Sequence, residues 1–170
     1  LLPEGDTLDY LVSLSSPIPG DHTNTTLIRS VSGVSMLLHY DISTPRPYSR
    51  MQTICCTLGF LQKYPVPSIQ IEEKKGSITL TGDEAVAYVE NFIPEEFKEI
   101  IENGKRLGVG NVMNYTMDYR IVESIERLRL HQDNTPLDMD VYDAALWSSV
   151  IELTDTSARN NSERVLFPRF

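Results

Sequence analysis

The sequence predicts an α+β fold in which a large, mostly antiparallel, open sheet carries helices packed on one face. Period-two alternation of apolar residues dominates the first half of the chain, and helical periodicity dominates the second half. Short glycine-containing links between the expected strands require antiparallel pairing. Strands followed by helices are typical of a layered α+β architecture. We expect the second sheet face to meet water or a partner.

The clearest strand covers residues 34–41, where apolar side chains alternate with others. The face expected to be strongly buried holds Val34, Met36, Leu38 and Tyr40. The mixed opposite face holds Ser35, Leu37, His39 and Asp41. A hairpin link at Ser32-Gly33 joins this strand to the one before it. Further strands are expected at 10–15, 24–31 and 50–56, in a hairpin over 68–82 that turns near Lys75-Gly76, and at 164–170.

Two adjacent cysteines, Cys55 and Cys56, lie within one of these strands. Neighbouring strand side chains point to opposite faces, so a disulfide between them would be strained. No other Cys or His lies at metal-ligand spacing from them, and the sequence predicts no metal site. We therefore expect two free thiols that pack as small hydrophobic side chains.

Four helices are expected in the second half. Thr81 and Glu84 form a capping-box pattern ahead of the first, over residues 85–92. Pro94 suits the first turn of the second helix, and the third has one apolar face. The second helix carries Phe97, Ile100 and Ile101, and the apolar face of the third holds Met117, Ile121, Ile125 and Leu128, with Arg127 and Arg129 facing water.

The last expected helix begins at Asp140, a good N-cap residue. Its core-facing stripe is expected to hold Ala144, Trp147, Ile151 and Thr154. Asp138, Asp140 and Asp143 gather at its start. Because the helix macrodipole and capping favour acids at this end, a structural role explains the cluster better than catalysis.

The composition of the chain indicates its domain number and excludes some classes of partner. At 170 residues with 41% hydrophobic content, the chain suits one domain, residues 1–170, with its own core. A net charge of −9 argues against a nucleic-acid partner, and no apolar stretch is long enough to cross a membrane. The chain opens without a start Met or a signal sequence, so we expect it to be part of a longer protein.

Motifs for self-contained catalysis are missing. The glycines at 108 and 110 have the wrong spacing for a dinucleotide loop, so we expect no cofactor-binding residue in this chain. His22, His39 and His131 are scattered and are better explained as ordinary surface or sheet residues than as catalytic bases. No acid and base pair can be chosen from carboxylate spacing. We therefore expect no catalytic residue in this chain.

One stretch does point to binding. Pro45 and Pro47 fix φ and remove backbone donors, so the chain leaves the sheet in a stiff, extended corner. Such a corner aims the phenol of Tyr48, and less directly the guanidinium groups of Arg46 and Arg50, at a hydroxyl-rich ligand. On physical grounds alone an alternative is favoured, in which Arg50 pairs with a nearby acid and Tyr48 packs at a sheet edge.

Five blocks carry a family resemblance. In order they are "TTLIRS", "HYDISTPRPYSR", "GFLQKYP", "MDYRIVESI" and "PLDMDVYDAALWSSVIELT". Together they resemble the C-terminal part of glycoside hydrolase family 109, NAD-dependent glycosidases within the Gfo/Idh/MocA superfamily. The resemblance covers nearly the whole chain, and the blocks around Pro45–Arg50 and Leu137–Trp147 are the most specific.

The resemblance implies an N-terminal Rossmann domain that holds NAD and is absent from this chain, followed by an α/β domain on a large open antiparallel sheet. Family members act on terminal α-linked N-acetylgalactosamine. They oxidise the sugar transiently at C3, which acidifies the C2 hydrogen, lets the C1 substituent leave, admits water and then reverses the oxidation. NAD is therefore recycled. A family tyrosine at the sugar site would correspond to Tyr48.

One block departs from the family. Where many relatives resemble "GHGGMDY", this chain has "GVGNVMNY", with Val109 at the histidine position and Asn114 at the aspartate position. Two hypotheses follow. The chain is the substrate-side domain of an NAD-dependent glycosidase acting on an N-acetylgalactosaminide, or it is a non-catalytic module that forms homo-oligomers through its open sheet face. On either, the isolated chain is expected to fold but to catalyse nothing.

Overall fold

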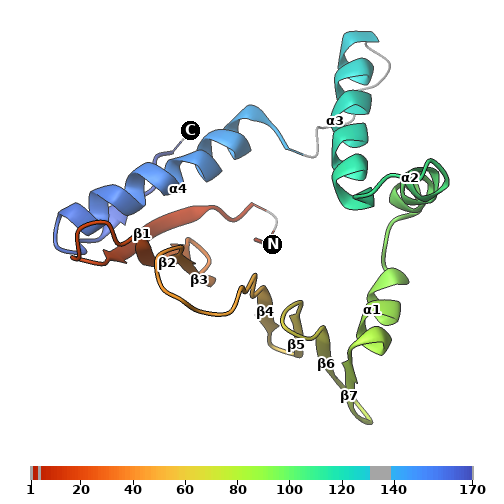
Figure 1. The fold of residues 1–170 in the computed structure, drawn as a ribbon, viewed down its shortest axis with the longest axis horizontal. Coiled ribbons are helices and arrows are strands. Elements are labelled where there is room, and N and C mark those ends of the chain that lie inside the picture. The colour runs from red at the N-terminus through yellow and green to blue at the C-terminus, as the bar shows by residue number, and fades with distance from the viewer. Residues whose placement is uncertain (1, 4, 131–138, 170) are drawn as a thin grey trace. The chain divides into compact units, whose positions relative to one another are not determined.

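The structure is a computed structural model that describes residues 2–3, 5–130 and 139–169. The chain divides into two compact units, one of Leu1–Arg46 with Pro136–Phe170 and one of Pro47–Thr135. Each unit contains a four-stranded antiparallel sheet, with one described helix in the first unit and three in the second (Figure 1). The predicted α+β class and the antiparallel pairing are therefore confirmed, with the strands divided between two sheets.

The sheet of the first unit has the strand order β3-β2-β1-β8. Its strands are β1 (Leu8–Ser15), β2 (Thr23–Ser30), β3 (Ser35–Asp41) and β8 (Val165–Leu166). The predicted hairpin between β2 and β3 is confirmed, with Gly33 at φ 98°, a conformation that glycine adopts without strain. The predicted C-terminal strand is confirmed as β8, which pairs with β1.

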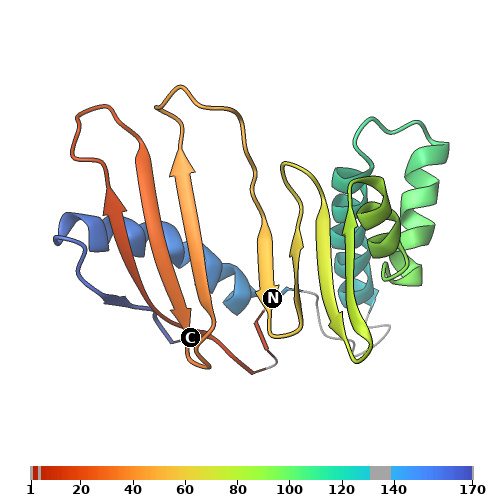
Figure 2. The same ribbon diagram turned by 90° about the horizontal axis from the view of Figure 1, so that it is seen from below.

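Helix α4 (Val141–Arg159) lies along one face of this sheet (Figures 1 and 2). Leu11, Ile28 and Phe167 are buried at the centre of the core between them. The partly buried side chains packed around this centre are Leu8, Met36, Leu146, Val150, Leu153 and Val165. Asp140 caps the helix as predicted, and its side chain accepts hydrogen bonds from the backbone N–H groups of Tyr142 and Asp143.

Two predictions about buried faces in this unit are wrong. Helix α4 packs through Leu146, Val150 and Leu153, whereas Trp147 and Ile151 of the predicted stripe are exposed. On β3 the predicted face buries Met36 only in part, and Leu38 and Tyr40 are exposed. The reason in both cases is position, because α4 packs against the central strand β1 and the terminal strand β8, while β3 forms the opposite sheet edge.

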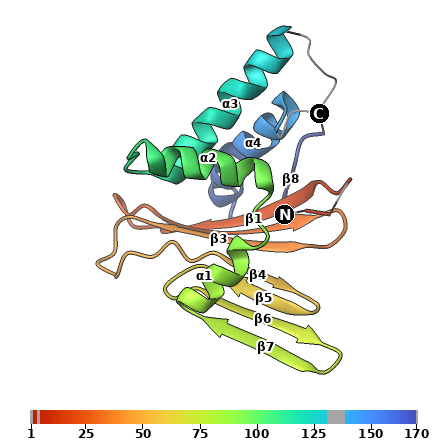
Figure 3. The same cartoon turned by 90° about the vertical axis from the view of Figure 1, so that its right-hand side faces the viewer.

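The sheet of the second unit has the order β4-β5-β6-β7, in which every neighbouring pair is antiparallel (Figure 3). Its strands are β4 (Thr53–Cys56), β5 (Gly59–Gln62), β6 (Ser68–Glu73) and β7 (Gly76–Thr81). The hairpin predicted near Lys75-Gly76 is confirmed between β6 and β7. Gly59 is required where β5 meets β6, because a Cβ there would lie 2.0 Å from the Gln70 carbonyl oxygen.

Three helices complete this unit: α1 (Asp83–Glu90), α2 (Glu95–Arg106) and α3 (Val112–Leu130). Helix α1 contacts β7, and α2 packs against α3. At that contact Arg120 lies over the Phe97 ring, with 5.1 Å from Cζ to the ring centroid, and pairs with Glu123 at 3.1 Å. Gly104 fits closely against the Tyr115 ring, which leaves no room for a Cβ.

Several local predictions in the second unit need correction. Helix α1 is capped by the backbone of Gly82 with no side-chain hydrogen bond, because Thr81 still belongs to β7, where it pairs with Ser68. The two cysteines are free as predicted, but both are exposed and not packed as small hydrophobic residues. They lie on β4, the edge strand of the sheet, which no further described strand covers.

Helix α3 also differs from expectation. Its predicted apolar face is exposed throughout, since α3 contacts α2 through its other side. The exposed residues of this face are Met117, Ile121, Ile125 and Leu128. Arg129 faces water as predicted, whereas Arg127 is half-buried with its Nε shielded from solvent.

Candidate functional site

The proline corner begins at a carboxylate that organises the chain around it. Asp41 ends β3, and its side chain is only 4% exposed. One carboxylate oxygen accepts hydrogen bonds from the backbone N–H groups of Ser43 (2.9 Å) and Thr44 (3.0 Å), and the other accepts from the Thr44 hydroxyl. These bonds, the Thr44 hydroxyl first, hold the pKa of the Asp41 carboxyl well below its usual range. The corner therefore starts from a fixed, charged turn.

Arg46 is held by this carboxylate and by a histidine. Its Nε lies 3.2 Å from Asp41 Oδ2, and its Nη1 lies 2.9 Å from His39 Nε2. A guanidinium can only donate, so His39 Nε2 accepts and the ring proton of neutral His39 resides on Nδ1. That Nδ1–H donates a hydrogen bond of 2.8 Å to the Thr25 hydroxyl oxygen. Arg46 thus has a fixed orientation while its side chain remains 43% exposed.

Unlike Arg46, Tyr48 is held through its backbone carbonyl and its ring. Its carbonyl oxygen accepts a hydrogen bond of 2.6 Å from the Tyr64 hydroxyl, and the guanidinium carbon of Arg50 lies 5.6 Å from its ring centroid. Tyr48 as a whole residue is 68% exposed. No partner within the described residues occupies its phenol oxygen. The phenol is therefore available to donate to a ligand and to accept from it.

The structure places the three predicted binding residues in two groups. Tyr48 and Arg50 contact each other within the second unit, whereas Arg46 interacts with Asp41 and His39 within the first unit. In the described chain Arg50 lies over the Tyr48 ring and forms no ion pair with an acid. The exposed groups are suited to hydrogen-bonding sugar hydroxyls, and the two described bases beside Arg46, His39 and Asp41, are both engaged by its guanidinium.

The segment that departs from the family sequence has a structural role here. The backbone N–H of Val109 donates to the Gly104 carbonyl at 3.0 Å and so closes the end of α2. Asn114 lies in the first turn of α3, where its N–H donates to the Asn111 side chain at 3.1 Å. The glycines in this loop do not follow a strand, so they form no phosphate cradle of the dinucleotide type.

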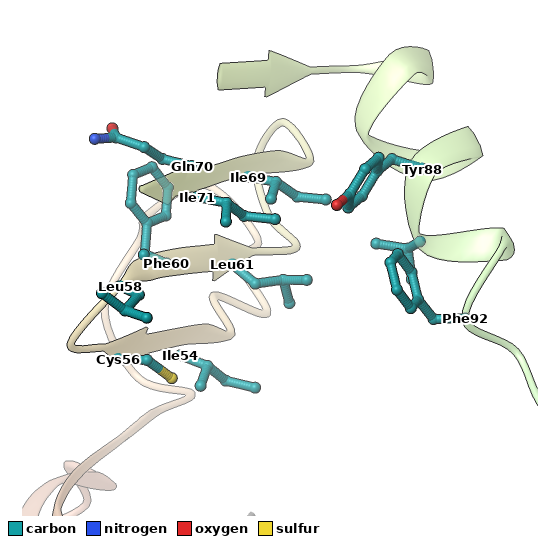
Figure 4. A pocket seen from close by; sticks show the side chains of 12 residues that line it. Ile54, Cys56, Leu58, Phe60, Leu61, Ile69, Gln70, Ile71, Tyr88 and Phe92 are labelled. Atoms are coloured by element: carbon teal, nitrogen blue, oxygen red, sulfur yellow. The ribbon is translucent and has the colours of Figure 1, made fainter. Parts of the chain in front are cut away.

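A groove of about 430 Å³ lies between the second sheet and α1 (Figure 4). Ile54, Leu61 and Ile69 extend from the sheet toward Tyr88 of α1 and Phe92, which follows the end of α1. Its lining is almost entirely apolar, and a sugar would leave most of its hydroxyl groups without partners there. We therefore do not assign the groove to the sugar.

The remaining candidates that the structure describes have structural contacts. Asp140 and Asp143 form a reciprocal capping box, with the Asp140 N–H donating to Asp143 Oδ2 at 3.0 Å, so their structural role is confirmed. Asp138 and His131 lie outside the described residues. His22 donates its backbone N–H to the Ser43 hydroxyl, which ties it to the corner. Among the described side chains, no group of three His, Cys, Asp or Glu residues could hold a metal ion.

Sequence reasoning missed three residues around the corner: Asp41, His39 and Tyr64. Asp41 had a local signal, because an Asp followed by Ser and Thr two and three residues later is typical of an Asx turn. The roles of His39 and Tyr64 depend on contacts 7 and 16 residues away along the chain, which periodicity does not reveal.

None of the described helices is both long and apolar enough to pass through a bilayer.

These features define an α+β fold whose described residues expose the Tyr48 phenol and the Arg46 guanidinium at the proline corner. Residues 10–170 match the family model of glycosyl hydrolase 109, C-terminal domain, and the chain belongs to this family. It is 39% identical to "Glycosyl hydrolase family 109 protein 2" of Phocaeicola vulgatus, over 98% of this chain and 44% of that protein. It is also 39% identical to an "Alpha-N-acetylgalactosaminidase" of Bacteroides fragilis, over 98% of this chain and 43% of that protein. The chain spans less than half the length of these relatives.

Proposed function

We propose that this chain is the substrate-side domain of an NAD-dependent glycosidase that acts on terminal α-linked N-acetylgalactosamine or a related glycoside. The observation that carries this proposal is the 39% identity, over 98% of the chain, to a relative named alpha-N-acetylgalactosaminidase. The exposed corner supports it, because Tyr48 offers a free phenol and Arg46 and Arg50 offer guanidinium donors. In this role Tyr48 binds a sugar hydroxyl, and the two arginines contribute more weakly.

The proposal assigns the cofactor to protein outside this chain. The described residues contain no glycine cradle for a pyrophosphate, and the relatives are more than twice as long as the matched region. NAD bound there would supply a reversible oxidation of the sugar. This chain's own residues would bind and orient the sugar through the corner. We accordingly expect the isolated 170-residue chain to fold and to show no glycosidase activity.

The test compares the full-length protein and its Tyr48→Phe variant on an N-acetylgalactosaminide, with and without added NAD. We expect activity that depends on NAD. Tyr48→Phe should lower kcat/KM by a factor that corresponds to about 1–3 kcal/mol of transition-state stabilisation. This is a typical cost of leaving a buried polar group unpaired in the complex. Tyr142→Phe is the matched control, because Tyr142 is an exposed phenol on α4.

Each result has a distinct meaning. Equal kinetics for Tyr48→Phe and the wild type would remove Tyr48 from the sugar site. A large loss of melting temperature would instead make its ring a structural element. Full activity after removal of NAD, or none on any glycoside tested, would contradict the NAD-dependent glycosidase itself.

A second candidate function is homo-oligomerisation through the open face of the first sheet. On the side away from α4, Val12, Leu27 and Leu37 form one cross-strand row, in which Leu27 and Leu37 are exposed. Exposed apolar rows are typical of interfaces, and a two-fold dimer would pair this row with its own copy. Sedimentation of the wild type and of Leu27→Glu tests this role, with Ile18→Glu, an exposed loop residue, as the control. A monomeric wild type at high concentration would contradict it.

A further inference from the structure

The proline corner does not fix the backbone of Tyr48, the residue proposed to bind the sugar. Pro45 and Pro47 fix their own φ and restrict the residues before them, Thr44 and Arg46. Tyr48 follows the second proline and is not itself followed by one. Between residues 45 and 51, a stretch described throughout, no backbone-to-backbone hydrogen bond holds the chain. Some other contact must therefore set the direction in which Tyr48 leaves the corner.

The Tyr64 hydroxyl makes that contact. It donates to the Tyr48 carbonyl oxygen at 2.6 Å, a short hydrogen bond that joins residues 16 positions apart. Tyr64 is itself anchored to the sheet of the second unit. The preceding residue, Lys63, donates its N–H to the Gln52 carbonyl at 2.9 Å, directly beyond the paired residues Thr53 and Gln62 of β4 and β5. The sheet therefore fixes Tyr64, and Tyr64 fixes the backbone of Tyr48.

We propose that Tyr64 is a positioning residue that orients Tyr48 toward the sugar, an inference that rests on the proposed function. The bond uses the Tyr48 carbonyl and leaves its phenol free, while Arg50 lies over the Tyr48 ring. Tyr64 thus restricts the peptide group of Tyr48 without competing for the group that binds. Its contribution to binding is the pre-organisation of Tyr48 and involves no contact with the substrate.

The first test is a double-mutant cycle in the full-length protein, with Tyr64→Phe, Tyr48→Phe and the double variant. Tyr64→Phe should lower kcat/KM on an N-acetylgalactosaminide by about 2- to 10-fold, the range for one hydrogen bond. Because Tyr64 acts through Tyr48, the same change should have no effect in the Tyr48→Phe background. The NAD affinity and the melting temperature should stay within error of the wild type, as they should for the control Tyr142→Phe.

The second test needs no activity. With 3-fluorotyrosine in place of tyrosine, the fluorine NMR signal of Tyr48 is assigned as the one that Tyr48→Phe removes. We expect this signal to shift or broaden in Tyr64→Phe and to stay unchanged in Tyr142→Phe. An unchanged Tyr48 signal in Tyr64→Phe would overturn the positioning role, whatever the substrate proves to be.

The two tests separate the failures. Equal losses from Tyr64→Phe in both backgrounds would show that Tyr64 acts independently of Tyr48 and would overturn the inference. No loss from Tyr64→Phe in the wild-type background would overturn it as well. A shifted Tyr48 signal in a protein without glycosidase activity would support the contact between the two tyrosines and contradict the proposed function.

Discussion

The two units bury their side chains in different ways. In the first, α4 closes one sheet face over Leu11, Ile28 and Phe167. Buried hydroxyl groups lie beside this apolar centre, on Ser13, Thr26, Ser30 and Ser157. In the second unit the groove between the sheet and α1 stays open, and the apolar face of α3 is exposed. Its buried residues are spread over the four elements β6, α1, α2 and α3: Ile69, Ala85, Ile100, Gly104 and Thr116.

This difference indicates where each unit obtains its stability. The first unit has a closed core joined by hydrogen bonds, so single substitutions there should be costly. The second unit exposes apolar surface of the kind that marks interaction sites, so its stability depends more on what covers that surface. The single tryptophan, Trp147, lies on α4 and is exposed, which makes its fluorescence a reporter of the first unit alone.

The largest expected effect is at the centre of the first core. Leu11 is 0% exposed, so Leu11→Ala should remove packed atoms and leave a cavity. We expect a loss of about 2–5 kcal/mol in the free energy of unfolding, followed in urea by Trp147 fluorescence. Leu58→Ala is the matched control in the second unit, because Leu58 is exposed, and it should change the same transition by less than about 0.5 kcal/mol. Similar losses for both would contradict the contrast between the units.

A smaller effect is expected from the hydrogen bonds within that core. The Ser157 hydroxyl accepts from the Ser13 backbone N–H at 2.9 Å and donates to the Glu163 carbonyl at 2.6 Å. Ser157→Ala leaves a buried N–H without its acceptor, which should cost about 1–3 kcal/mol in the same unfolding experiment. Ser148→Ala, an exposed serine on the same helix, should be nearly neutral. A neutral Ser157→Ala would show that the buried hydroxyl groups do not stabilise the unit.

The sequence predicted the elements better than their buried faces. Alternation and helical periodicity predicted seven of the eight described strands and all four described helices, because the spacing of apolar residues is local information, whereas β5 (Gly59–Gln62) was missed. The core face of α4 could not be predicted in this way. The helix carries two apolar stripes, one with Leu146 and Val150 and one with Trp147 and Ile151, and only tertiary contacts decide which is buried. The same applies to β3, whose edge position is not encoded in its alternation.

The candidate site was predictable to a similar extent. The two prolines and Tyr48 are adjacent in sequence, so a stiff corner that presents a phenol followed from local stereochemistry. The contacts of Arg46 with His39 and of Tyr48 with Tyr64 arise from chain folding and had no sequence signal. Whether Tyr48, Arg46 and Arg50 bind sugar stays a prediction.

The third effect is at the start of α4. Asp140 accepts from the N–H groups of Tyr142 and Asp143 at 2.7 and 2.9 Å. Asp140→Ala should therefore destabilise the first unit by about 0.5–2 kcal/mol, measured by Trp147 fluorescence in urea. Glu152→Ala, an exposed acid in the middle of the same helix, should have almost no effect. A loss from Glu152→Ala as large as that from Asp140→Ala would indicate a general charge effect in place of capping.

The smallest expected effect concerns the carboxylates, whose contribution to stability depends on pH. The Ser32 hydroxyl, which donates to Asp6 at 2.5 Å, together with further hydrogen bonds lowers the pKa of Asp6 to about 2, and Asp41 is shifted in the same direction. Among the described residues, every carboxyl group with a clearly lowered pKa lies in the first unit. Acid should therefore distinguish the two units.

The sign follows from linkage. A carboxyl group whose folded pKa lies below its unfolded value of 3.8 stabilises the fold fully above about pH 4, and this contribution is lost as the pH falls toward about 2. We expect the urea midpoint reported by Trp147 to fall over this window. Asp6→Asn should lower the urea midpoint at pH 7, where the charged carboxyl stabilises the fold, and should approach the wild type near pH 2, which flattens part of that fall. Asp118→Asn, an exposed carboxyl in the second unit, should leave the acid profile of Trp147 unaltered. An equal flattening by both substitutions would mean that overall charge controls the acid response and that the Asp6 hydrogen bonds do not.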